Sequence, residues 1–155
     1  MPNSWLKVPH FQQEFDYSCV AACVRMVLAH HGDLRAEAEL RSLLDTQPTG
    51  TRAGNIMRIS GPTFEVYLRA SNMAELQKVL AENQPPIVLM QTGTLEYWNA
   101  DIFHAAVLVG FDTVNVALND PYFATAPQTT SLQSFEKAWS QTGQFSAFIR
   151  PRQKA

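Results

Sequence analysis

The sequence predicts an α+β fold in which a helical N-terminal part packs on a C-terminal antiparallel sheet. Helical patterns come first along the chain and β-type runs come later, an order that favours this fold class. Residues 19–31 are apolar on nearly every side except at Arg25, so they predict a helix inside the domain rather than on its surface. The length of 155 residues supports one domain, residues 1–155, with its core at about residues 8–149.

Each expected element follows from the spacing of apolar residues and from the turn residues around it. Gly32 ends the buried helix, because glycine readily takes the conformation that closes a helix. Asn72 is the expected cap of a later helix, and Pro85 and Pro86 separate that helix from the strands that follow. The predicted helices cover residues 19–31, 35–44, 73–83 and 132–139, and a short one ends the polar stretch 50–60. The predicted strands cover residues 63–68, 87–91, 103–110, 114–118 and 145–149.

Composition and charge exclude several classes of protein. Apolar residues make up 46% of the chain and charged residues 17%, a balance that excludes a disordered protein. The net charge of −2 supplies no field that would hold a nucleic acid or an anionic membrane. No apolar run reaches the roughly 20 residues of a membrane span, and the first residues show no export signal. We therefore expect a cytoplasmic protein without a membrane span or a nucleic-acid partner, whose two cysteines are free thiols.

Cys19 is the candidate nucleophile. It stands at the predicted first turn of the buried helix, where the positive end of the helix dipole favours a thiolate. The alternative is a small apolar filler, which is the commoner role of a cysteine, and Cys23 on the same helix face fits that role. The spacing of the two cysteines is not that of a zinc knuckle, and the chain has no second pair. We therefore expect neither a metal nor another cofactor.

A hairpin within residues 103–118 supplies a candidate base and acid. Two β-type runs joined by a short turn should pair antiparallel, which places Leu108 opposite Val116 and His104 opposite Asp120. Directly opposed side chains lie close enough for an imidazole and a carboxylate to share a hydrogen bond. The carboxylate would fix one ring nitrogen as a donor and leave the other to deprotonate a thiol. A merely structural His–Asp pair is the alternative, and both interpretations stay open at this point.

Acyl transfer by a thiolate also needs hydrogen-bond donors for the negative charge that develops on the substrate oxygen. The backbone N–H of Cys19, free at a helix start, is one candidate. The side-chain amide of Gln12 or Gln13 is the other. The alternative is that both are ordinary exposed glutamines.

These residues resemble the papain-fold leader peptidases that process double-glycine bacteriocin precursors. The resemblance covers roughly residues 8–149 and is carried by Gln13, five intervening residues, Cys19, an apolar helix, His104 and the segment Asn119-Asp120-Pro121. That family usually forms the N-terminal cytosolic domain of peptide-exporting ABC transporters. The resemblance implies a papain-like cysteine peptidase fold, a peptide or protein substrate, and an export system as partner.

The resemblance also implies roles for four residues. The nucleophile, the base, the orienting acid and the oxyanion-hole amide would be Cys19, His104, Asp120 and Gln13. The spacing of the motif prefers Gln13 over Gln12.

Two departures from the family pattern concern the substrate. Val20 stands where the family commonly has a glycine after the nucleophile, so we expect added bulk in the narrow double-glycine cleft. Residues 92–102 form a longer link than usual, and we predict that Tyr97 and Trp98 in this loop face substrate. Paired aromatic residues on a polar connection are costly unless they cover something. Packing on the domain's own edge is the alternative for this loop.

The sequence thus predicts a cysteine peptidase or amidase that uses a Cys–His–Asp triad, with cleavage after small residues such as Gly-Gly in a leader peptide. Two alternatives stay open. One is a non-catalytic peptide-binding module of the same fold, although the presence of all four candidate residues favours chemistry. The other is an acyltransferase that uses the same triad.

Overall fold

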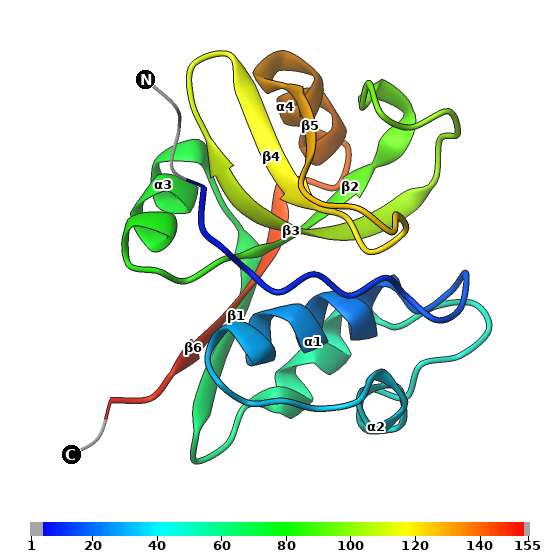
Figure 1. Cartoon of the computed structure of the whole chain (residues 1–155), viewed down its shortest axis with the longest axis vertical. Coiled ribbons are helices and arrows are strands. Elements are labelled where there is room, and N and C mark those ends of the chain that lie inside the picture. The colour runs from blue at the N-terminus through cyan, green and yellow to red at the C-terminus, as the bar shows by residue number, and fades with distance from the viewer. Residues whose placement is uncertain (1–4, 154–155) are drawn as a thin grey trace.

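A six-stranded antiparallel sheet organises the structure, a computed structural model that describes residues 5–153 (Figure 1). Of the predicted domain 1–155, residues 1–4 and 154–155 lie outside the described part. The strands are β1 (Phe64–Ala70), β2 (Ile87–Gln91), β3 (Phe103–Phe111), β4 (Asn115–Asn119), β5 (Gln128–Ser131) and β6 (Phe145–Pro151). Their order across the sheet is β1-β6-β2-β3-β4-β5, and each neighbouring pair is antiparallel.

Between residues 5 and 153, four α-helices and two 3-10 helices accompany the sheet. They are α1 (Cys19–His30), α2 (Glu37–Leu43), η1 (Ala53–Ile59), α3 (Met73–Ala81), η2 (Thr92–Thr94) and α4 (Leu132–Ser140). In Figure 1, α1, α2 and η1 lie on one side of the β3–β4 region and α4 lies on the other. The predicted α+β class, with helices before most of the strands and an antiparallel sheet, is therefore confirmed.

The strands β2 and β3 separate two hydrophobic clusters because successive side chains of a strand point to opposite faces. Ala105, Val107 and Val109 of β3 pack in the cluster that contains α1. Ala106 and Leu108 pack in the cluster that contains α4. The central strands are thus covered on both faces, which explains their nearly continuous apolar sequence.

Helix α1 is the interior helix that the sequence predicts. Eight of its 12 residues are buried, which matches its apolar character on nearly every side. Gly32, just past its end, has φ +90°, a left-handed conformation that glycine adopts without strain. The predicted cap of α3 is also present, since Asn72 Oδ1 accepts a hydrogen bond from Glu75 N at 2.8 Å.

Strand β5 is the one element of the sheet that the sequence analysis did not predict. Its residues Gln-Thr-Thr-Ser are polar, and the strand lies at an edge, where few apolar side chains are required.

None of the helices within residues 5–153 is long and apolar enough to cross a lipid bilayer.

Candidate active site

The candidate nucleophile, base and acid lie together where α1 begins beside one end of β3 and β4. Cys19 is the first residue of α1, His104 lies near the start of β3, and Asp120 directly follows the end of β4. Because α1 packs against β3, the fold brings the thiol to the strand that holds the imidazole. His104 and Asp120 are buried, whereas Cys19 is only partly covered. The thiol therefore remains open to solvent beside a buried polar pair.

His104 Nε2 donates a hydrogen bond to Asp120 Oδ1 at 2.6 Å, although the predicted strand register was wrong. The prediction placed Leu108 opposite Val116, but the structure pairs Leu108 with Leu118 and has a bulge between this pair and the turn. A slip of two residues keeps every side chain on its original face. Asp120 consequently lies diagonal to His104 rather than directly opposite, within reach of the imidazole.

Asp120 is a buried carboxylate whose two oxygens each accept two hydrogen bonds. Oδ1 accepts from His104 and from the backbone N–H of Tyr122, the latter at 3.0 Å. Oδ2 accepts from the hydroxyl of Tyr97 and from the indole N–H of Trp98, both at 2.9 Å. Burial alone would raise the pKa of Asp120, but these hydrogen bonds, above all that from His104, bring the pKa below its ordinary value. Asp120 is therefore ionised beside the imidazole.

The environment of His104 favours its protonated form at neutral pH. Burial by itself would lower the pKa of His104, but hydrogen bonds with Asp120 and Cys19 outweigh burial and raise the pKa to about 9. Because Nε2 is bound to Asp120, Nδ1 is the ring nitrogen that remains for the Cys19 sulfur. A protonated imidazole beside a cysteine is the arrangement that accompanies a thiolate nucleophile.

Cys23 lies in a different environment from Cys19. It is fully buried, and burial, together with the charges of Cys19 and Asp120, raises the pKa of its thiol well above the ordinary value. Cys23 is therefore a protonated, packed side chain.

Within residues 5–153, the structure contains no group of three or more His, Cys, Asp or Glu side chains arranged to hold a metal ion.

Gln13 lies against the segment that carries the acid. Its backbone N–H donates to the carbonyl of Pro121 at 2.7 Å. Its side-chain Nε2 donates to the carbonyl of Phe15 at 2.8 Å, which uses one of its two N–H groups. The neighbouring Gln12 is exposed and donates from Nε2 to the carbonyl of Tyr122 at 3.1 Å. Both glutamines therefore have structural partners, and Gln13 keeps one N–H for another acceptor.

Glu37 supports the segment before the nucleophile, a role that the sequence analysis missed. This buried carboxylate of α2 accepts hydrogen bonds from Glu14 N at 3.0 Å and from Ser18 Oγ at 3.3 Å. Its other oxygen pairs with Arg41. In the sequence, Glu37 is simply one acidic residue on an amphipathic helix, so no local signal distinguishes it from the exposed Glu39.

The structure places Tyr97 and Trp98 on the protein's own carboxylate. Both side chains are half-buried, and both donate to Asp120. The preceding residue, Glu96, accepts hydrogen bonds from Thr130, Ser131 and Ser134 at the junction of β5 and α4. The alternative expected for residues 92–102, packing on the domain's own edge, describes these contacts. Contact of this loop with substrate stays a prediction.

Val20 does not add bulk at an accessible surface, contrary to expectation. Its side chain is 3% exposed and packs in the cluster that contains α1. The first turn of the helix directs Val20 into the core while Cys19 stays at the surface. Val20 is therefore a packing residue in this structure, and its contact with substrate stays a prediction.

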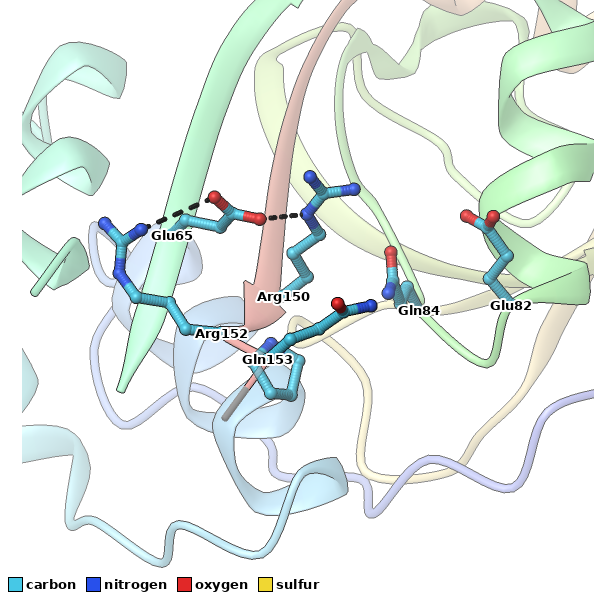
Figure 2. A pocket seen from close by; sticks show the side chains of 7 residues that line it. Glu65, Glu82, Gln84, Arg150, Arg152 and Gln153 are labelled. Carbon is cyan, nitrogen blue, oxygen red and sulfur yellow. Dashed lines mark hydrogen bonds and ion pairs between the residues drawn. The ribbon is translucent and has the colours of Figure 1, made fainter. Parts of the chain in front are cut away.

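A polar pocket at the β1–β6 edge of the sheet contains none of the candidate site residues. Figure 2 shows Glu65 between Arg150 and Arg152, with which it forms ion pairs. The cavity measures about 600 Å³, and Glu82 and Gln84 also line it. Its charged side chains largely neutralise one another, so it offers no obvious chemistry.

Comparisons with known proteins bear on the family and on the fold. The model of the Peptidase_C39 like family matches residues 5–147. A C39-like peptidase of Bacillus anthracis superposes with a TM-score of 0.78 at 18% identity, over 96% of each chain. A double-glycine motif protease from an AMS/PCAT transporter, solved with its leader peptide, gives 0.75 at 20% identity over 96% of this chain and 94% of that one.

The peptidase domain of Streptococcus ComA, a bifunctional ABC transporter of a quorum-sensing pathway, gives a TM-score of 0.72 at 22% identity. That match covers 92% of this chain and 98% of the domain. A search of curated protein sequences gives no match. The structural likenesses confirm the expected papain-like peptidase fold.

Proposed function

The chain belongs to the Peptidase_C39 like family, and on that premise we propose that it is a cysteine peptidase that cleaves a peptide bond through Cys19, His104 and Asp120. The observation that supports this most strongly is the buried hydrogen bond of 2.6 Å between His104 Nε2 and Asp120 Oδ1. It leaves the second ring nitrogen beside a partly exposed thiol at a helix start. A structural His–Asp pair would not require a cysteine on its free side.

The proposed reaction proceeds in two stages. The Cys19 thiolate attacks the scissile carbonyl carbon, and the backbone N–H of Cys19 with the free N–H of Gln13 binds the resulting oxyanion. Collapse of this intermediate breaks the C–N bond, while His104 gives its proton to the departing amine. Water, deprotonated by His104, then attacks the thioester and releases the acid and Cys19.

We propose a peptide with small residues, such as Gly-Gly, before the scissile bond as the substrate. A structurally similar protein is a double-glycine motif protease in complex with a leader peptide. Because the Val20 side chain is buried in the core, it does not fill the narrow cleft beside Cys19 that a Gly-Gly substrate would need. An export system is the proposed partner and the cytoplasm the proposed location, because the similar Streptococcus domain is part of an ABC transporter.

Release of a fluorescent amine from a peptide that ends in Gly-Gly tests this proposal. We expect the wild type to release it and Cys19→Ala to be inactive with an unchanged circular dichroism spectrum. Cys23→Ala is the matched control and should retain activity, because Cys23 is buried away from solvent. Turnover by Cys19→Ala would refute the assignment.

Two other outcomes would also overturn the proposal. Binding of the peptide by the wild type without cleavage would identify a peptide-binding module. Products in which the acyl group is joined to an added amine, with no free acid, would identify an acyltransferase.

A further inference from the structure

The loop before β3 carries two adjacent aromatic residues, Tyr97 and Trp98, whose side chains donate hydrogen bonds to the same atom. The Tyr97 hydroxyl and the Trp98 indole N–H both donate to Asp120 Oδ2 at 2.9 Å. The other oxygen, Oδ1, is thereby left for His104 and the backbone N–H of Tyr122. The two sides of the carboxylate are thus assigned to different partners.

We propose that Tyr97 and Trp98 are positioning residues of this site: together they hold the Asp120 carboxylate in the orientation in which Oδ1 faces His104. The inference rests on the proposed function, since it gives the two residues a part in the same reaction. It also assigns them a role other than substrate contact.

Two physical requirements favour this role. A buried carboxylate is costly unless its lone pairs are satisfied, and these two donors fill one side of Asp120. They are also neutral, so they stabilise the anion without supplying a positive charge that would compete with the imidazolium of His104. An arginine or lysine at the same place would neutralise the acid that the base needs.

Trp98 contacts the base as well as the acid. Its ring lies 5.0 Å from that of His104, measured between centroids, with an interplanar angle of 63°. This edge contact restricts rotation of the imidazole and helps to exclude water from its hydrogen bond with Asp120. One side chain therefore limits the movement of both members of the pair.

The loop that carries the two residues is fixed on both sides. Before them, Glu96 binds the start of α4 through Ser131 and Ser134, and β5 through Thr130. After them, Ala100 and Ile102 are held by Thr92 at the start of the loop: Thr92 Oγ1 donates to the Ala100 carbonyl at 2.6 Å and accepts from Ile102 N at 3.0 Å. Such anchoring suits a fixed support for Asp120.

The pH dependence of Cys19 alkylation by iodoacetamide tests the inference without a substrate. The variants are Tyr97→Phe and Trp98→Phe. The matched control is Tyr122→Phe, because the Tyr122 side chain is exposed and this residue meets Asp120 only through its backbone N–H. Tyr97→Phe removes a single oxygen atom, so it keeps the test valid if Trp98→Phe fails to fold.

We expect the wild type and Tyr122→Phe to be alkylated at Cys19 at pH 6. In Tyr97→Phe and Trp98→Phe the acid limb should move to higher pH, since Asp120 loses a donor that favours its ionised form. On that acid limb, the rate at a given pH should fall about tenfold, as expected for one hydrogen bond to a charged group. A loosened loop alone would change the amplitude of the profile but not the position of its acid limb.

The outcomes separate this inference from the proposed function. If Cys19 of the wild type is no more reactive at pH 6 than a free thiol, the proposed function fails. If the wild type is reactive and both variants follow its profile at every pH, the positioning role is overturned while the peptidase proposal stands. With the Gly-Gly reporter peptide, we expect both variants to have a lowered kcat at unchanged KM. A raised KM at unchanged kcat would overturn the positioning role and identify a substrate-facing loop.

Discussion

The backbone N–H of Gln13 donates to the carbonyl of Pro121 at 2.7 Å, which ties the segment before Cys19 to the residue directly after Asp120. The carbonyls of the next two residues accept hydrogen bonds from the side chains of Gln12 and His10. In Figure 1 this N-terminal segment runs between α1 and the β3–β5 part of the sheet. The proposed oxyanion amide and the proposed acid therefore sit on two segments that hold each other through backbone atoms.

Asp120→Asn should lower kcat about 10⁴-fold. Tyr97 and Trp98 both donate to the Oδ2 position, so the amide oxygen is expected there and the NH2 group turns toward His104. An NH2 group at that place requires Nε2 of the ring as its acceptor. The ring proton then moves to Nδ1, on the side of Cys19, where no base remains.

The measurement is kcat for the Gly-Gly reporter peptide. Asp16→Asn removes the same charge from an exposed position near Cys19 and should change kcat less than about twofold. A rate for Asp120→Asn close to that of the wild type would show that Asp120 does not orient the base.

The rate should fall as the pH rises through about 9, because the pKa of His104 is raised to about 9. The raised pKa means that the protonated ring persists through neutral pH and is lost only on the alkaline side. That ring is the proposed proton donor to the leaving amine. In a profile of kcat/KM against pH, the alkaline limb of Asp120→Asn should move to lower pH. An alkaline limb at the same pH in both proteins would show that Asp120 does not raise the pKa of His104.

The sequence predicts which segments form helices and strands better than it predicts the register in which the strands pair. Residues of α1 and β3 are apolar in patterns that are purely local, and both elements were predicted within a few residues of their ends. The register of β3 on β4 depends on a bulge next to Leu108, which no residue pattern indicates. His104 and Asp120 nonetheless meet, because an even slip leaves both on one face of the hairpin.

The partners of Asp120 could not be predicted for a different reason. The sequence predicts that Tyr97 and Trp98 cover some surface. Which surface they contact, the Asp120 carboxylate, depends on the position of β4 in the sheet. Glu37 is similar, since its burial depends on where α2 packs beside the segment before Cys19. Contacts between elements that are distant in sequence have no local signature when polar residues make them.

Glu37→Gln should lower the free energy of unfolding by about 2 kcal/mol, because the buried acceptor of Glu14 N and Ser18 Oγ loses its charge. The expected fall in Tm is about 4–8 °C for a chain of this size. Arg41 keeps a second ion pair with Glu14, which limits the loss. Thermal denaturation at pH 7 checks this value.

The control for Glu37 is Glu39→Gln on the same helix. Glu39 is exposed and pairs only loosely with Arg35, at 3.4 Å, so its replacement should cost less than about 0.5 kcal/mol. Equal shifts in Tm for the two variants would mean that burial of Glu37 gives it no special part in holding the segment before Cys19.

Glu96→Gln should lower Tm at pH 7, and the difference from the wild type should vanish in acid. Hydrogen bonds from Ser134, Thr130 and Ser131 lower the pKa of Glu96 to about 2. The depressed pKa means that this contribution to stability is fully present above the ordinary pKa of about 4.3 and is lost as the pH falls toward 2. Glu136→Gln changes an exposed carboxylate of α4 and should shift Tm little at any pH. Thermal melts of the three proteins between pH 2 and pH 7 provide the measurement. A gap between Glu96→Gln and the wild type that stayed constant over that range would mean that the ionised form of Glu96 does not hold the loop.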